Sequence, residues 1–182
     1  MGAYAVQLAN HSNIHPLLCV AGTSSAHVES LIDRSKGDTI INYRHGDDAV
    51  VAGLKKAAGG AKLLYAFDAV SENGSYVNLS QVLDPGGKLT LVLPWGDYGR
   101  IPKHISRSIT SGSSVHKGYD QDFGYRFYRY ISRGLQNGWL KGHPHRVVPG
   151  GRGGVGQALK DLKNGMAHGF KYVFRIADTE GL

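Results

Sequence analysis

Cysteine is almost absent from this sequence. Cys19 is the single thiol, so neither an internal disulfide nor a cysteine-rich zinc site can form. Long apolar runs are absent too: no stretch reaches the roughly 18 residues of a membrane-spanning helix, and the first residues lack a signal-peptide pattern. No Gly-x-Ser-x-Gly nucleophile motif occurs, and no histidine is spaced with acidic residues as a metal ligand would be. We therefore expect a cytoplasmic protein with no bound metal and no membrane association.

Glycine and basic residues, in contrast, are abundant. The chain has 182 residues, of which 26 are glycine, a frequency that indicates many tight turns between short elements. Hydrophobic residues make up 41%, which suffices for one well-buried domain. The net charge of +7 favours an anionic partner, and a phosphorylated cofactor, a nucleic acid and an acidic protein all fit that description.

Hydrophobic patterning predicts an alternation of short strands and helices. Expected strands are 16–21, 39–43, 61–69, 88–93, 113–119 and 171–176, and expected helices are 2–10, 28–34, 48–58, 74–83, 123–135 and 157–164. The segment 96–112 looks like a loop. Strands separated by single helices imply right-handed crossovers and a mostly parallel sheet. The fold class is therefore α/β, and we see no boundary that would divide residues 1–182 into separate domains.

Two places compete for a dinucleotide-binding glycine turn. Gly151 to Gly156 match the G-x-G-x-x-G fingerprint and precede a helix, with Asp178 further on, but too little chain follows to build a nucleotide-binding half. The alternative is Gly2 at the start of the first helix, in the position of the third glycine of the fingerprint. A first strand and two further glycines would have to precede it.

Residues 2–9, Gly-Ala-Tyr-Ala-Val-Gln-Leu-Ala, resemble the helix after the glycine loop in medium-chain dehydrogenases/reductases. The nearest branches are the zinc-independent quinone oxidoreductases and the fungal trans-acting enoyl reductases. Further similar segments follow in the same order: Ile41-Asn42-Tyr43-Arg44, Phe67-Asp68-Ala69-Val70, Gly86-Gly87-Lys88-Leu89, Pro149-Gly150-Gly151 and Gly169-Phe170-Lys171-Tyr172-Val173. In that family a Pro-Gly-Gly turn precedes the last helix, which explains the fingerprint at Gly151 without a cofactor.

The resemblance implies a Rossmann-type, doubly wound, mostly parallel sheet that lacks its first strand and glycine loop. Residues 1–182 would form a single truncated dinucleotide-binding domain, and the N-terminal catalytic domain would be absent. The implied cofactor is NADP(H), and the implied substrate of the whole enzyme is a small enone or quinone. We expect the chain alone to lack turnover, and a non-catalytic remnant of a reductase is an alternative. No residue of this chain is assigned a catalytic role.

Charge after the expected strand 16–21, which corresponds to the second strand of a dinucleotide-binding fold, bears on the choice of cofactor. NAD-specific sites place an acid there, whereas this chain has none between Gly22 and His27. Small hydroxyls and backbone donors suit a 2′-phosphate, to which His27, Tyr43 and Arg44 can add. By resemblance, cofactor-binding residues are expected at ten positions: Gly2, Ser24, Ser25, Ala26, His27, Tyr43, Gly118, Tyr119, Lys171 and Tyr172. Simple helix capping by Ser24 and Ser25 is an equally good interpretation of each residue alone, and Asp68 is more typical of a helix cap than of catalysis.

Residues 123–130 interleave aromatic side chains with arginine. An apolar helical stripe is indicated by the spacing of Phe123, Phe127, Tyr130 and Ile131, which favours a buried core face with arginines beside it. A basic nucleic-acid-binding module is the rival interpretation. The resemblance also implies a homodimer formed edge to edge, for which 113–119 is the expected edge strand.

Overall fold

A computed structural model describes residues 1–181 and divides the chain into two compact units, Met1–Leu140 and Lys141–Leu182. Each unit has its own parallel strands and is described by itself. The assignment of residues 1–182 to a single dinucleotide-binding domain stays a prediction. Within the described residues, no helix is long and apolar enough to cross a membrane.

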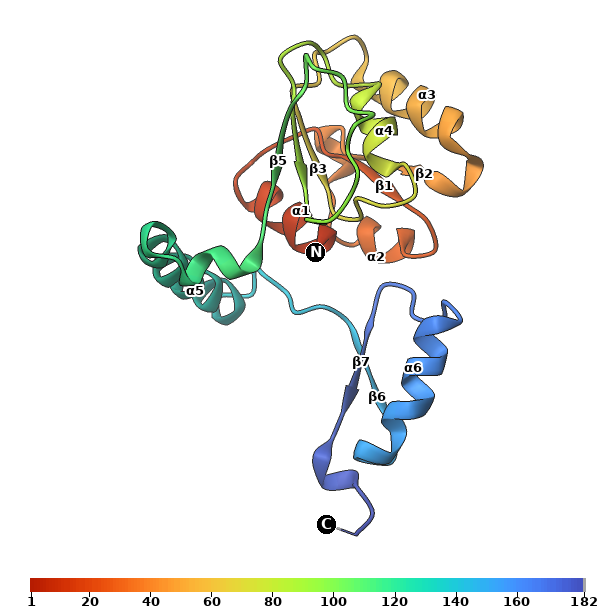
Figure 1. The fold of residues 1–182 in the computed structure, drawn as a ribbon, viewed down its shortest axis with the longest axis vertical. Coiled ribbons are helices and arrows are strands. Elements are labelled where there is room, and N and C mark those ends of the chain that lie inside the picture. Colours follow the sequence, from red (N-terminus) through yellow and green to blue (C-terminus); the bar gives the residue numbers. More distant parts are fainter. Residues whose placement is uncertain (182) are drawn as a thin grey trace. The chain divides into compact units, whose positions relative to one another are not determined.

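Strands and helices alternate through the first unit (Figure 1). Its strands are β1 (Leu18–Ala21), β2 (Thr39–Asn42), β3 (Tyr65–Asp68), β4 (Lys88–Leu91) and β5 (Ser106–Ile109). Its helices are α1 (Gly2–His11), α2 (Ser25–Glu29), α3 (Asp47–Ala58), α4 (Ser75–Ser80) and α5 (Gln121–Gln136). Short 3-10 turns join several of these elements.

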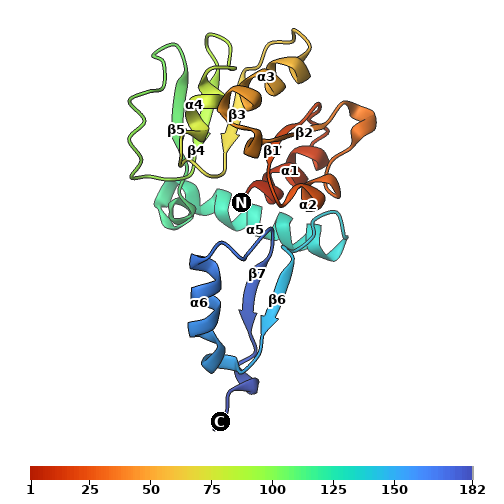
Figure 2. The same cartoon turned by 90° about the vertical axis from the view of Figure 1, so that its right-hand side faces the viewer.

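All the strand pairs of this unit are parallel, as the alternation predicts. β1 pairs with β2, with Leu18 opposite Thr39, and a separate sheet has the order β3-β4-β5, with Lys88 between Tyr65 and Ser106. β1 and β3 lie in neighbouring positions in both views (Figures 1 and 2), yet they belong to different sheets. The expected α/β fold of Rossmann type, with mostly parallel strands, is confirmed.

The sequence of α3 shows why this helix forms and how it joins the two sheets. Gly46, with φ 94°, precedes two acidic residues in the first turn, and Gly59, with φ 58°, ends the helix after two lysines, so the charges match the helix dipole. Val50 and Leu54 are buried on one side. At its start, the Asn78 Nδ2 of α4 donates to Asp47 Oδ1 at 2.7 Å. The helix therefore links the β1–β2 sheet to the β3–β5 sheet.

The core of the first unit is built around β4, the middle strand of the β3-β4-β5 sheet. Leu89 and Leu91 of β4 are completely buried, and each contributes about 1.5–3 kcal/mol through burial. Leu83, Tyr98 and Ile105 complete this buried cluster.

Two expectations about the region after β4 are wrong. β5 lies within 96–112, where a loop is expected. All four of its residues are exposed, and its polar sequence has no alternation typical of a strand. It is a strand because its backbone pairs with β4. Residues 113–119 form 3-10 turns rather than a strand. The outer strand of this sheet is therefore β5. The helix expected at 28–34 also differs, since α2 begins at Ser25 and ends at Glu29.

The expected apolar stripe of α5 is not a buried face. Phe123 is 62% exposed, Phe127 36% and Tyr130 39%, while Ile131 is half-buried. The helix instead buries glycines: a Cβ at Gly124 would lie 2.8 Å from Val115, and one at Gly134 would meet the Trp139 ring. The glycines permit close packing, and the aromatic side chains remain outside.

The second unit contains a parallel pair of strands and one helix. β6 (His145–Val148) pairs with β7 (Lys171–Phe174), and α6 (Val155–Lys163) connects them. Residues Gly151–Gly154 form a 3-10 turn before α6, and Gly156 lies in that helix. A Cβ at Gly151 would collide with Thr179 and one at Gly154 with Pro149. This glycine run serves packing, as expected from the Pro-Gly-Gly turn.

Candidate functional site

The candidate site lies at the carboxyl ends of β1 and β2. In open parallel sheets, ligands bind at this edge because the strand-to-helix turns present their backbone there. After β1 the chain passes through Gly22 and the Ser24–His27 segment into α2, and after β2 it enters a 3-10 turn beginning at Tyr43. Because β1 and β2 are parallel neighbours, the segments that follow them both lie at the same edge of the sheet.

Gly22 and Tyr43 form the contact that joins these two segments. A Cβ added at Gly22 would lie 2.5 Å from Tyr43 Cε1 and 2.9 Å from the hydroxyl, so only glycine lets the ring lie against this turn. Tyr43 is 53% exposed, which leaves much of its ring open to a ligand. The expected neighbourhood of Tyr43 and the loop after β1 is therefore present.

The Ser24–His27 segment is a tight turn at the start of α2. Ser24 is the N-cap residue, yet its side chain makes no capping hydrogen bond, so simple capping does not account for it. The Ser25 hydroxyl donates to the carbonyl of Gly22, and the amides of His27 and Val28 both donate to Ser24. Hydrogen bonds within the segment therefore hold the turn, and the Ser24 hydroxyl makes no capping hydrogen bond.

Acidic charge is lacking close to this turn. Glu29 is the first acid after it, and its carboxylate accepts from Arg34 Nε at 2.8 Å and also from Arg34 Nη2. The hydrogen bond from Arg34 lowers the pKa of Glu29. Arg44 follows Tyr43 and is exposed. The edge therefore presents hydroxyls, a phenol and a guanidinium, which suit a phosphate better than a ribose diol held by an acid.

Asp68 at the end of β3 has a structural role. Its Oδ1 accepts from the amides of Val70 and Ser71 at 3.0 and 2.9 Å, and its Oδ2 accepts from the Ser75 hydroxyl at 2.6 Å. The carboxylate is buried and stabilises the turn between β3 and α4. It does not cap the helix as expected, because Gly74 is the N-cap residue of α4 and no side chain makes a capping hydrogen bond there. Beside it, a Cβ at Gly2 would lie 3.4 Å from Ala69, so α1 begins at the same edge.

Four of the expected residues lie elsewhere. Gly118 and Tyr119 form a 3-10 turn between β5 and α5, where Tyr119 is 82% exposed. Lys171 and Tyr172 begin β7 in the second unit, opposite His145 and Arg146. The structure gathers Ser24, Ser25, Ala26, His27 and Tyr43 at one edge, and the cofactor-binding role of all ten expected residues stays a prediction.

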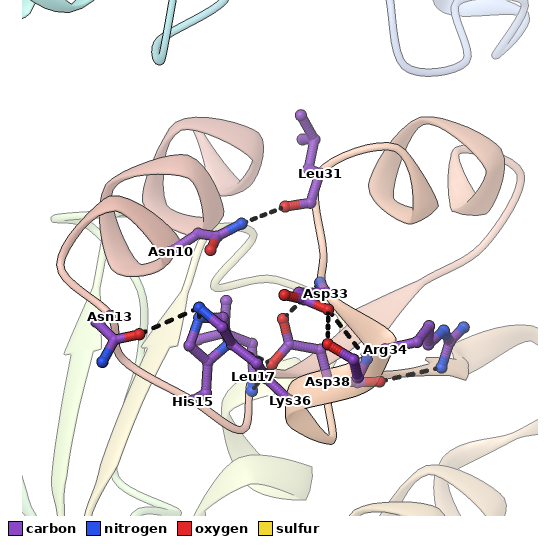
Figure 3. Close-up of polar contacts among 10 residues, drawn as sticks. Asn10, Asn13, His15, Leu17, Leu31, Asp33, Arg34, Lys36 and Asp38 are labelled. Carbon is purple, nitrogen blue, oxygen red and sulfur yellow. Dashed lines mark hydrogen bonds and ion pairs between the residues drawn. The ribbon is translucent and has the colours of Figure 1, made fainter.

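A buried polar network lies at the amino ends of β1 and β2, opposite the candidate site (Figure 3). It is not among the features predicted from the sequence. Asp38 Oδ1 accepts from the Leu17 amide at 2.7 Å and lies 2.8 Å from His15 Nδ1, while its Oδ2 accepts from the Asp33 amide at 2.9 Å. Burial would raise the pKa of Asp38, but these hydrogen bonds together lower it below its ordinary value. The network fixes the beginnings of both strands. An acid directly before a strand is its only sequence signal.

Cys19 in β1 is not a reactive thiol. Burial, reinforced by the negative charge of Asp38, raises its pKa to about 11, so the thiolate is scarce at neutral pH. Among the described residues, no three His, Cys, Asp or Glu side chains gather as a metal site.

Curated relatives of this chain are fungal reductases. It is 54% identical over 151 residues to the trans-enoyl reductase fsr4 of Gibberella fujikuroi, a match covering 82% of this chain and 44% of the relative. It is 28% identical to the trans-enoyl reductase ACTTS2 of Alternaria alternata, over 96% of this chain and 52% of the relative. The chain therefore spans about half the length of these relatives. No family model matches it.

Solved structures with the same fold include enzymes of related classes. The ER cyclopropanase CurF of the curacin A biosynthetic pathway matches with a TM-score of 0.68 at 17% identity, over 93% of this chain and 50% of that one. A Pseudomonas syringae quinone oxidoreductase matches with 0.67 at 16%, over 94% and 53%. The mycobacterial protein Rv1454c, solved with NADPH, matches with 0.62 at 17%, over 90% and 49%. This chain is thus similar in sequence to about half of the length of trans-enoyl reductases, and it shares its fold with enoyl reductases and quinone oxidoreductases of the medium-chain dehydrogenase/reductase superfamily.

Proposed function

We propose that the first unit is the NADP(H)-binding part of an oxidoreductase of the enoyl-reductase or quinone-oxidoreductase type. The observation that carries this proposal is the Gly22–Tyr43 contact, which holds a tyrosine ring beside the acid-free turn after β1. Ser24, Ser25, Ala26 and His27 would bind the 2′-phosphate, with Arg44 adding positive charge, and Tyr43 would cover the adenosine. The similarity to reductases, together with an NADPH complex of the same fold, favours this function over a nucleic-acid-binding module.

The reaction proposed for the whole enzyme is hydride transfer to a small enone or quinone. The cofactor supplies the hydride, and the protein supplies orientation and electrostatics. The residues of the β1–β2 edge would bind the nucleotide without taking part in the chemical step. The cytoplasm is the compartment that the composition favours for this function.

The Gly22→Ala variant tests the nucleotide site most directly. The added methyl group forces the Tyr43 ring away from the turn, so we expect NADPH affinity to fall on the order of tenfold, about 1.4 kcal/mol. Gly112→Ala is the matched control, because a Cβ there meets nothing within 4 Å. Isothermal titration calorimetry with NADPH and NADH measures both variants, and the unchanged chain should prefer NADPH.

A double substitution separates the role of the ring from general damage. In a Tyr43→Ala background, Gly22→Ala has no ring to displace and should cost little further affinity. Equal losses in both backgrounds, or tighter binding of NADH than of NADPH by the unchanged chain, would contradict the proposed site.

We further propose a homodimer formed through β5, the outer strand of the β3-β4-β5 sheet. Its four residues are exposed, and an unpaired parallel edge of this kind can pair with the same edge of a second copy. Light scattering over micromolar concentrations should give twice the 19.6 kDa of the chain. A monomer mass across that range would exclude the dimer.

A further inference from the structure

The edge at the carboxyl ends of β1 and β2 continues to the ends of β3 and β4. α1 begins beside the residue that follows β3, since a Cβ at Gly2 would lie 3.4 Å from the Ala69 Cβ. It ends next to the end of α2, where Asn10 Nδ2 donates to the Leu31 carbonyl at 3.1 Å. The two helices therefore begin at one edge, and both views show α2 and the start of α1 on the same side of the first unit (Figures 1 and 2). A ligand bound beside β1 and β2 can extend along this edge to β3 and β4.

Trp95 lies on the loop that follows β4 at this edge. The amide of Val92, the first residue after β4, donates to the Ser71 hydroxyl at 3.0 Å, and that hydroxyl donates to the Asp68 carbonyl at 3.0 Å. The loop is thus bound at its start to the turn after β3. Three residues further on, the Trp95 side chain is 86% exposed. Tryptophan is highly buried on average, so an indole that is exposed at a ligand-binding edge indicates a contact with a ligand.

A buried tyrosine holds this loop in place. Tyr98 is 4% exposed, and its hydroxyl donates to the Leu93 carbonyl. Its ring lies against Gly96, where a Cβ would lie 2.4 Å from Tyr98 Cζ, so only glycine fits there. From β5, Arg107 Nη1 donates to the Tyr98 carbonyl at 2.9 Å. These contacts fix the backbone on both sides of Trp95, so the loop presents the indole as a preorganised binding residue.

The edge has two chemically different parts. Beside β1 and β2 it presents hydroxyls, a phenol and a guanidinium, which suit a phosphate. At the ends of β3 and β5, Val70 is 57% exposed and Ile109 46%, and β4, which leads to Trp95, lies between these strands. A nicotinamide dinucleotide phosphate also has two such ends, a phosphorylated adenosine and a planar ring without phosphate. The edge therefore matches both ends of this molecule.

We propose that Trp95 stacks on the nicotinamide ring and favours its oxidised form. This inference rests on the proposed nucleotide site, with the adenosine at β1 and β2. The ring is positively charged in NADP+ and uncharged in NADPH, and the face of an indole attracts a cation. At exposed sites this attraction corresponds to about a three- to fivefold difference in affinity. Trp95 is therefore a specificity residue that distinguishes the two oxidation states of one cofactor.

Calorimetric titration of the 182-residue chain with NADP+, NADPH and 2′,5′-ADP separates the two parts of the edge. The last of these ligands is the phosphorylated adenosine part alone. Trp95→Ala should weaken NADPH binding about fivefold through lost stacking, and NADP+ binding about twentyfold, because the attraction of the cation is lost as well. Binding of 2′,5′-ADP should stay within about twofold. Tyr65→Ala is the matched control: it removes an aromatic side chain that is 76% exposed at the amino end of β3, and it should change none of the three affinities.

Fluorescence gives a second readout, which reports the contact itself. The chain has two tryptophans, and the ring of the other one, Trp139, stacks on His11 with the ring centroids 3.8 Å apart. NADP+ does not absorb the light that tryptophan emits, so it quenches an indole through contact. It should therefore quench the unchanged chain but not Trp95→Phe, in which only Trp139 remains. We expect 2′,5′-ADP to quench neither.

The possible outcomes separate this proposal from the proposed nucleotide site. Equal losses of NADP+ and NADPH affinity in Trp95→Ala, or NADP+ that binds without quenching, would overturn the role of Trp95 alone. A loss of 2′,5′-ADP affinity as large as that of NADP+ would overturn it too, because the effect would then not be specific to the nicotinamide ring. If 2′,5′-ADP did not bind while NADP+ still quenched Trp95, the adenosine site would be wrong and the role of Trp95 would stand. Binding of neither ligand would overturn both.

Discussion

Asp38→Ala should lower the free energy of unfolding by about 3 kcal/mol at pH 7, because removal of the carboxylate leaves buried donors unsatisfied at roughly 1–3 kcal/mol each. The amides of Leu17 and Asp33 lose their acceptor, and His15 loses its partner. Urea unfolding followed by circular dichroism measures the change. Asp48→Ala is the matched control: it removes an exposed carboxylate from α3, for which we expect a change within about 0.5 kcal/mol.

The pH dependence of this difference follows from the direction of the Asp38 pKa. Its folded pKa is lowered below the ordinary value of 3.8, so the folded state favours the ionised form. The associated stabilisation is complete above the unfolded pKa and is lost as the pH falls through the folded one. The stability gap between the unchanged chain and Asp38→Ala should therefore narrow below about pH 4. A gap that widened on acidification would contradict the assigned hydrogen bonds.

The 182-residue chain should oxidise NADPH with an enone or a quinone no faster than buffer does. Reductases rely on holding the substrate against the nicotinamide, and such positioning supplies about 7–11 kcal/mol of rate acceleration. The residues gathered at the β1–β2 edge are those proposed to bind the 2′-phosphate and the adenosine, and the chain spans about half the length of its relatives. Absorbance at the NADPH band, with a quinone oxidoreductase as positive control, measures the rate. Turnover proportional to chain concentration and lost in Tyr43→Ala would show that this expectation is wrong.

The sequence predicts those parts of the fold that local patterns determine. α3 is predicted to within one residue because acidic and basic residues mark its ends and Gly59 stops it. β4 is apolar and follows a Pro-Gly-Gly turn, and it too appears where expected. β5 is not predicted, because its Ser-Arg-Ser-Ile sequence has no apolar alternation. It is a strand through its backbone pairing with β4.

In the candidate site, too, local sequence patterns predict some features, and others depend on residues far apart in the chain. The resemblance predicts Ser24 to His27 and Tyr43 as cofactor-binding residues. The contact between Gly22 and Tyr43 depends on the register of β1 and β2, which no local sequence pattern encodes. The His15–Asp38 network is likewise formed by residues 23 positions apart. The aromatic side chains of α5 mislead for another reason: their helical spacing is real, yet the helix packs through its glycines.

The Gly22–Tyr43 contact also constrains how this chain can diverge. As long as an aromatic ring occupies position 43, any side chain at position 22 carries a steric cost. Loss of the ring removes that cost. Substitutions at the two positions should therefore be accepted in a fixed order during evolution, with the tyrosine lost before the glycine. Descendants that keep the tyrosine should keep the glycine, whereas those that have lost the tyrosine are free to vary at both positions.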